Sequence, residues 1–272
     1  MVLLYLSITL LFFSSMEVIS KPFMETIDPF FLTFIRFLIG GSFLMLWVKK
    51  KVLLKDVISL SFIGFLNSGI SMTLLQLSVK YGAASTAATL IATNPLFVMM
   101  FSPLINKEKL GIKKFIGFLI GLVGLLIFSR EKIAEDTTFG ILSGLGAGIT
   151  FALYTTLMKK YVNRYDSITP TAYSMLLSSL IYGLFLIFCR KLEIPILTVS
   201  NLLFIGYAGI GVTGIAYFLF FKAVEKIGSI SASRVFYLKP VIASILSMII
   251  LAEHPGIVKF IGMFMIILSM II

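Results

Sequence analysis

The sequence is poor in the residues that build most metal and catalytic sites. It has one cysteine, Cys189, and one histidine, His254. A single cysteine excludes an intrachain disulfide and a thiolate metal cluster. A single histidine in a predicted loop gives no support for a histidine metal site or a Ser/His/Asp triad. There is no phosphate-cradling glycine loop either. We therefore expect no metal, no other cofactor and no enzymatic activity.

Charge is also scarce, because only 13% of the residues are charged while 59% are hydrophobic. The mean hydropathy of +1.07 lies far from the balance of soluble domains and predicts a polytopic membrane protein. The net charge of +11 does not indicate nucleic acid, since the lysines and arginines lie between apolar segments. Anionic lipid headgroups are the expected partner of these residues.

Ten apolar segments are each long enough, at about 17 to 23 residues, to cross a bilayer as a helix. The sequence thus predicts an all-α integral membrane fold. The first segment has neither a basic leader nor a small-residue cleavage site, and we expect it to be retained. The predicted spans are Val2–Ile19, Pro29–Val48, Val57–Val79, Ala83–Ile105, Ile112–Ser129, Phe139–Met158, Ile168–Cys189, Ser200–Phe221, Ser229–Leu251 and Gly256–Ile272.

An internal duplication divides the chain. The segment EKLGIKKFIG at Glu108–Gly117 returns as EHPGIVKFIG at Glu253–Gly262, with seven of ten positions identical and an offset of 145 residues. The same offset pairs Pro95 with Pro240. We expect two repeats, residues 1–130 and 131–272. Five spans in each repeat would insert the two copies in opposite orientations, an architecture typical of secondary transporters.

The placement of basic residues predicts the orientation of the chain. With the N-terminus inside, the inner loops hold thirteen lysines and arginines and the outer loops hold seven. Because basic residues are retained on the cytoplasmic side, we expect both termini inside.

Lys239 is the sharpest candidate for a binding residue. A charge in the middle of a span costs about 2.5–3.5 kcal/mol to insert, so something must offset it. Lys239 precedes Pro240, and the repeat counterpart of this pair is Asn94 before Pro95. Both prolines remove a backbone donor at membrane depth, which favours broken helices that line a cavity. The alternative for Lys239 is a purely structural ion pair.

Other polar residues form stripes on apolar spans. Glu17 shares one helical face with neighbouring serines in the first span, and Asn67 lies in a similar stripe in the third span with Gln76 to one side. These stripes indicate a hydrated interior, or interhelical hydrogen bonding alone. Tyr154 and Tyr217 are candidates because a buried phenol needs a partner, although packing alone would also explain them.

Three further charged residues are predicted to be structural. Glu108 and Glu253 each precede a helix start, where free N–H groups stabilise a carboxylate. A gating ion pair is the alternative for them. Arg36, two turns into the second span, could snorkel outward or pair with Glu17, and we predict a structural role.

The sequence resembles the drug/metabolite transporter superfamily and, within it, the EamA-like ten-helix group. The matching stretches are PFFLTFIRF at Pro29–Phe37, AASTAATLIATNPLF at Ala83–Phe97, FLFFKAVEKIGSISASRVFYLKPV at Phe218–Val241 and the two duplicated segments. The resemblance implies a central cavity and alternating access without ATP hydrolysis. It places on the cavity walls Glu17, Asn67, Gln76, Asn94, Tyr154, Tyr217 and Lys239.

We therefore expect a secondary transporter in the cell membrane, with export the favoured direction, for a small polar metabolite such as an amino acid. Lys239 would bind a carboxylate, and Glu17 would bind an amine or carry a coupling proton. Export of a cationic drug or amine is the alternative within transport. A membrane enzyme or an accessory subunit is the alternative from another class. The protein would act as a monomer or homodimer.

Overall fold

The structure, a computed structural model, describes residues 1–109, 111–128, 136–252 and 256–271. These residues form helices joined by short turns, and they contain no strand. The α-helices are α1 (Val2–Ser20), α2 (Pro29–Met45), α3 (Leu54–Phe65), α4 (Met72–Lys80), α5 (Ala84–Ile91), α6 (Asn94–Asn106), α7 (Ile112–Phe128), α8 (Thr138–Arg164), α9 (Ile168–Phe188), α10 (Val199–Gly206), α11 (Tyr217–Ile227), α12 (Ser229–Ser233), α13 (Lys239–Ile250) and α14 (Ile257–Ile271). The tighter or wider helical turns are η1 (Lys21–Glu25), η2 (Leu66–Ser71), η3 (Tyr207–Ala216) and η4 (Arg234–Leu238).

Several of these helices continue into one another and form longer segments. Seven segments within the described residues are long and apolar enough to cross a membrane, and they are Val2–Glu25, Leu54–Lys80, Ala84–Asn106, Thr138–Arg164, Ile168–Phe188, Val199–Ile227 and Ser229–Ile250. Shorter apolar helices occupy Pro29–Met45, Phe115–Gly124 and Ile257–Ser269. Each of the ten predicted spans overlaps one of these segments. The chain is a multi-pass membrane protein.

The distribution of polarity agrees with a lipid environment. Leu3, Leu104 and Phe188 are at least 80% exposed on the outside, whereas Glu17 and Arg36 are at most 1% exposed inside. Water is absent from the bilayer core, so charged side chains must face the protein interior and apolar side chains can face lipid.

A proline follows the interruption of the α-helix in two of the long segments. In Ala84–Asn106 a turn separates α5 from α6, and Pro95 is the second residue of α6. In Ser229–Ile250 the 3₁₀ turn η4 separates α12 from α13, and Pro240 is the second residue of α13. Proline fits the first turn of a helix because the N–H it lacks has no partner there in any case.

The same 145-residue offset recurs in the helix boundaries. Five elements of the first half begin 145 residues before an element of the second half. The pairs are α3 with α10, α4 with α11, α5 with α12, α6 with α13, and α7 with α14.

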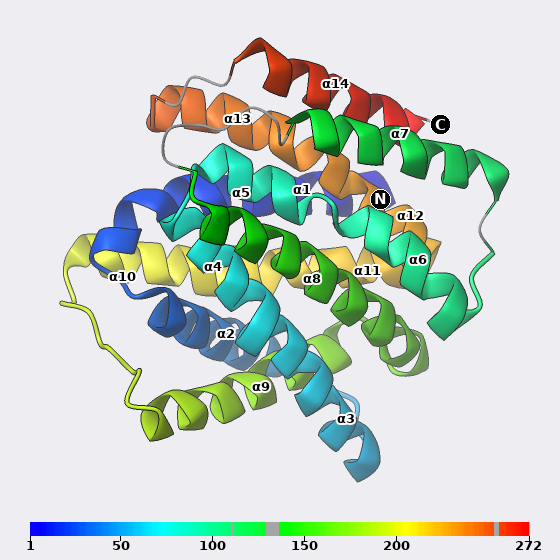
Figure 1. Cartoon of the computed structure of the whole chain (residues 1–272). Coiled ribbons are helices and arrows are strands. Elements are labelled where there is room, and N and C mark those ends of the chain that lie inside the picture. The colour runs from blue at the N-terminus through cyan, green and yellow to red at the C-terminus, as the bar shows by residue number, and fades with distance from the viewer. Residues whose placement is uncertain (110, 129–135, 253–255, 272) are drawn as a thin grey trace.

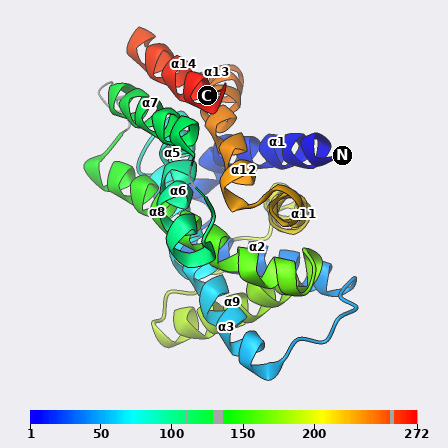
Figure 2. The ribbon, with the colours of Figure 1, turned by 90° about the vertical axis from the view of Figure 1, so that its right-hand side faces the viewer.

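The last of these pairs is packed side by side. Helices α7 and α14 run antiparallel along one edge of the molecule (Figures 1 and 2). A Cβ built on Gly121 would lie 3.0 Å from the Oγ of Ser269, and one built on Gly124 would lie 2.9 Å from the backbone N of Ile266. The contact is reciprocal, because Ile266 and Ser269 are themselves the 145-residue counterparts of Gly121 and Gly124.

Candidate substrate cavity

A small cavity lies in the interior, between elements of both halves of the chain. It is lined by Phe13, Met16, Glu17, Arg36, Met72, Leu75, Ile91, Phe151, Val212, Tyr217, Phe236 and Lys239. Most of these side chains are apolar, and three carry charge. This composition is typical of small-molecule sites, where a few polar groups in an apolar pocket orient the ligand.

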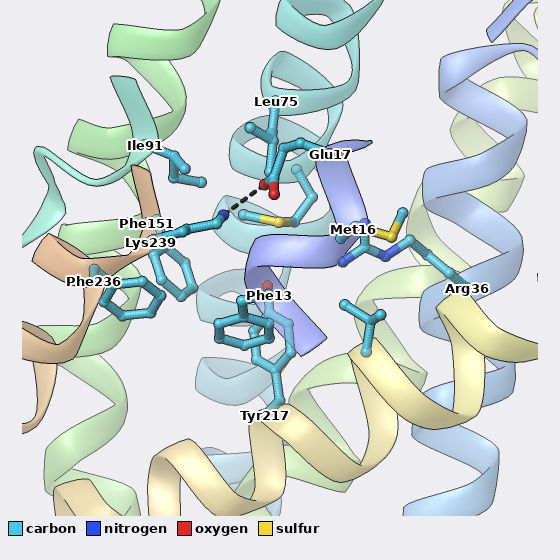
Figure 3. A pocket seen from close by; sticks show the side chains of 12 residues that line it. Phe13, Met16, Glu17, Arg36, Leu75, Ile91, Phe151, Tyr217, Phe236 and Lys239 are labelled. Carbon is cyan, nitrogen blue, oxygen red and sulfur yellow. Dashed lines mark hydrogen bonds and ion pairs between the residues drawn. The ribbon is translucent and has the colours of Figure 1, made fainter. Parts of the chain in front are cut away.

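An ion pair joins the two halves across the cavity. The Nζ of Lys239, at the start of α13, donates to Oε1 of Glu17 on α1 at 2.5 Å, and the two side chains are 4% and 1% exposed. Figure 3 shows the two side chains meeting across the cavity. Each charge offsets the desolvation cost of the other. The second carboxylate oxygen, Oε2, has no hydrogen-bond partner among the described residues.

Arg36 on α2 reaches into the cavity from the side opposite Lys239 (Figure 3). Its Nε donates to Oγ1 of Thr213 at 2.9 Å, and Thr213 in turn donates to the carbonyl of Ala208. Close packing of α2 on the π-helical turn η3 permits this bond, because a Cβ on Gly40 would lie only 2.8 Å from the carbonyl oxygen of Gly209. Thr213 therefore fixes the guanidinium in place.

Aromatic rings form one wall of the cavity. Phe13 stacks on Phe236 with ring centroids 5.7 Å apart and meets Tyr217 edge-on at 5.0 Å. Phe151 packs edge-on against both Phe236 and Tyr217. These rings come from four separate elements, so the wall depends on how the two halves pack together.

Three of the sequence-predicted binding residues, Glu17, Tyr217 and Lys239, line the cavity. Asn67 is buried behind the wall, where its Oδ1 accepts from the Tyr217 hydroxyl at 3.4 Å. The Tyr154 hydroxyl lies 3.5 Å from the Oγ of Ser174.

The two remaining predicted binding residues, Gln76 and Asn94, are fully buried but are not among the residues that line the cavity. Their side-chain amides have no hydrogen-bond partner in the described part of the chain. Arg36, which we predict from sequence to be structural, does line the cavity.

Glu108 binds the start of a helix in the other half of the chain. Its carboxylate accepts hydrogen bonds from the backbone N–H groups of Ser229 and Ile230 at 3.2 and 3.3 Å, and it forms an ion pair with Lys159. We call these residues the Glu108 latch. From sequence we predict that Glu108 stabilises the helix that follows it, α7. In the structure its carboxylate instead caps α12 and takes part in an ion pair. Its repeat counterpart, Glu253, lies outside the described residues.

Asp136 forms a similar contact at the start of α5. Its Oδ1 accepts from the N–H of Ala83 at 2.8 Å, and its Oδ2 accepts from the Thr86 hydroxyl at 2.8 Å. Lys259 on α14 lies 3.7 Å from the same carboxylate and donates to Thr86 at 2.8 Å. We call these residues the Asp136 latch. The helices that the two latches hold, α5 and α12, lie toward opposite ends of the molecule (Figure 1).

Sequence reasoning did not identify several of these residues. Asp136 and Lys159 lie at or beyond the ends of predicted spans, where charge is ordinary. Ala83 and Gly228 could have pointed to these residues. They occupy equivalent positions 145 residues apart, and neither can cap the helix that follows it, so each helix start needs a capping group from elsewhere in the chain. Phe13 lies four residues before Glu17, on the same helical face, and this spacing could have placed its ring beside the ion pair.

Comparison with known proteins identifies the class. The sequence model of the EamA-like transporter family matches residues 1–130 and 138–272. An uncharacterized transporter of Clostridium kluyveri is 30% identical over 99% of this chain and 91% of its own length. The uncharacterized transporter YdfC of Bacillus subtilis is 28% identical over 88% of this chain and 79% of its own length.

A solved crystal structure has the same fold, with a TM-score of 0.72 at 19% identity, and the match covers 99% of this chain and 95% of that one. The helical fold, the buried charged cavity and the named relatives together define a membrane transporter. The chain belongs to the EamA-like transporter family of the drug/metabolite transporter superfamily. Its environment is the membrane, and its partner is a small-molecule substrate.

Proposed function

We propose that the protein is a secondary-active exporter of a small polar metabolite such as an amino acid, acting in the cell membrane by alternating access. The observation that carries this proposal is the Glu17–Lys239 ion pair, which is enclosed in a cavity between the two halves. A zwitterion can replace the pair group by group. The substrate's carboxylate would bind Lys239 and its ammonium group would bind Glu17, so that each charged side chain keeps a partner of opposite charge. Glu17 is also the candidate for a coupling proton.

The architecture proposed for this activity is ten membrane-spanning helices in two inverted five-helix repeats, residues 1–130 and 131–272, with both termini inside. The five pairs of elements that begin 145 residues apart support the duplication. The reciprocal contact of α7 with α14 supports a two-fold axis between the repeats. A site near such an axis can open to either side when the two repeats exchange conformations.

The two latches are the proposed gates. With the N-terminus inside, the Glu108 latch would lie at the cytoplasmic end and the Asp136 latch at the outer end. Each latch holds the first turn of a segment that also contributes to the cavity lining, through Ile91 in one segment and Lys239 in the other. Opening one latch while the other stays closed would give access from one side only.

Export of a cationic drug or amine is the second candidate, and one observation favours it. Lys239 is already neutralised by Glu17, as that function requires. Arg36 weighs against it, because its charge in the cavity wall repels a cation.

Transport by purified protein in liposomes tests the proposal. Pooled metabolites would be screened with and without a pH gradient. We expect uptake or release of a zwitterion that Lys239→Met abolishes, while Lys55→Met, which removes an exposed lysine of α3, leaves it unchanged. A Glu17→Gln variant that keeps a pH-driven rate would exclude Glu17 as the proton carrier. If the pure protein moves no metabolite at all, an accessory subunit or a membrane enzyme is the better description.

A further inference from the structure

Arg36 brings a second positive charge into the cavity, where Glu17 is the one carboxylate that the lining supplies for two cations. Arg36 is 1% exposed and makes no ion pair among the described residues. Its Nε is held by the neutral hydroxyl of Thr213, and its Nη1 has no hydrogen-bond partner in the described part of the chain. A buried guanidinium is always charged, so the cavity holds an unbalanced cation.

The charges of the cavity therefore define a complementary ligand. Its walls carry two cations, Arg36 and Lys239, and one anion, Glu17. A ligand with two anionic groups and one ammonium group balances all three charges. A simple zwitterion balances only Glu17 and Lys239 and leaves Arg36 without a partner.

The geometry favours two separate anion positions. Arg36 and Lys239 enter from opposite sides of the cavity (Figure 3). One small carboxylate would serve one of them, whereas two carboxylates on a short chain can serve both. The guanidinium is suited to the second carboxylate, because its planar donors match that group and Thr213 already fixes its orientation.

We propose that the substrate is an amino dicarboxylate with one net negative charge, and that Arg36 selects it by binding the second carboxylate. This inference rests on the proposed function and narrows it from small zwitterions to acidic ones. Glutamate with glutamine, and aspartate with asparagine, are suitable probes because each pair differs in this one charged group.

The experiment measures binding of these four compounds to the purified full chain by the rise in its melting temperature, since a ligand stabilises the state it binds. We expect an acidic member of a pair to bind the wild type at least about tenfold more tightly than its amide, the effect of one charge-assisted hydrogen bond. In Arg36→Gln the preference should vanish or reverse. Arg36→Lys should keep part of it, because the charge remains while the planar fork is lost.

The ratio of the two affinities within one variant does not depend on how much of that variant folds. Lys239→Met is the contrasting variant and should weaken the acid and its amide together, because both offer it the same α-carboxylate. If the wild type binds the amides as well as the acids, or if Arg36→Gln keeps the preference, the inference is wrong while the proposed function stands. If none of the four compounds binds the wild type, the inference is also wrong, and the liposome screen of pooled metabolites decides separately on the proposed function.

Discussion

Ala83 and Gly228 occupy equivalent positions 145 residues apart, each immediately before a helix that it cannot cap. Helix α5 begins after Ala83 and α12 begins after Gly228. Cap positions favour Ser, Thr, Asp and Asn because their side chains accept from free N–H groups, and neither alanine nor glycine can do so. In both places a carboxylate from a distant segment accepts from the free N–H groups. Asp136 does so at the start of α5, and Glu108 at the start of α12. These helix starts thus depend on tertiary contacts that can be broken.

Weakening one latch should open the cavity from one side only. In a Cys189→Ser background with Val212→Cys in the cavity wall, Glu108→Gln should speed labelling by a membrane-impermeant maleimide from the cytoplasmic side. Loss of a helix cap costs about 1 kcal/mol, which corresponds to about a fivefold rise in the open population. Asp136→Asn should do the same from outside. Equal labelling from both sides in either variant would contradict the assignment of the latches as gates.

Gly228→Ala should destabilise the protein. Gly228 has φ 81° and ψ 164°, a region essentially confined to glycine, and an added Cβ would lie 2.9 Å from Oε1 of Glu108. We expect a loss of about 1–3 kcal/mol in the free energy of unfolding, measured by denaturant titration in detergent. Gly111→Ala is the matched control, because a Cβ there meets nothing within 4 Å. If Gly228→Ala and Gly111→Ala have the same free energy of unfolding, a side chain at position 228 does not strain the backbone.

Glu17 and Lys239 should be energetically coupled. Removing one partner of a buried pair leaves an uncompensated charge, so Glu17→Gln and Lys239→Met should each cost about 3–5 kcal/mol. The double variant should cost less than the sum of the two, and a double-mutant cycle on the free energy of unfolding measures the difference. If the two losses in the free energy of unfolding simply add in the double variant, the interaction between Glu17 and Lys239 does not contribute to stability.

Gly40→Ala should disturb Arg36 without touching its side chain. The new Cβ would lie 2.8 Å from the carbonyl oxygen of Gly209 and 2.9 Å from the Cβ of Thr213, and would push α2 away from η3. Overpacking of this kind costs about 1–3 kcal/mol. The Nε to Thr213 hydrogen bond should lengthen in a structure of the variant. Gly206→Ala, with open space around it, should leave the unfolding free energy nearly unchanged.

The sequence predicted the membrane fold well because hydrophobic length is a strong signal. The predicted span Ile168–Cys189 differs from α9 by one residue, and Ser229–Leu251 differs from its helical segment by one as well. The largest differences come where polar residues continue a helix beyond the apolar stretch. Helix α8 runs to Arg164 although the apolar pattern ends at Met158, and α11 runs to Ile227 rather than Phe221.

The candidate site was predicted only in part. Lys239 and Glu17 could be found because a charge within an apolar span must be compensated, whatever the fold. The partner of Arg36 could not be predicted from the sequence, because its hydrogen bond to Thr213 depends on the close packing of α2 on η3. Phe151 and Phe236 were indistinguishable from other phenylalanines, because which rings face the cavity is decided by tertiary packing.

The reciprocal contact of α7 with α14 has an evolutionary consequence. Gly121 meets Ser269 and Gly124 meets Ile266, the contacts that two copies of one surface make about a two-fold axis. Under the proposed inverted-repeat architecture, a half-length ancestor with this surface would have paired with a second copy of itself in the opposite orientation. Fusion of two copies into one chain would then have allowed positions 94 and 239 to carry different residues, Asn94 and Lys239.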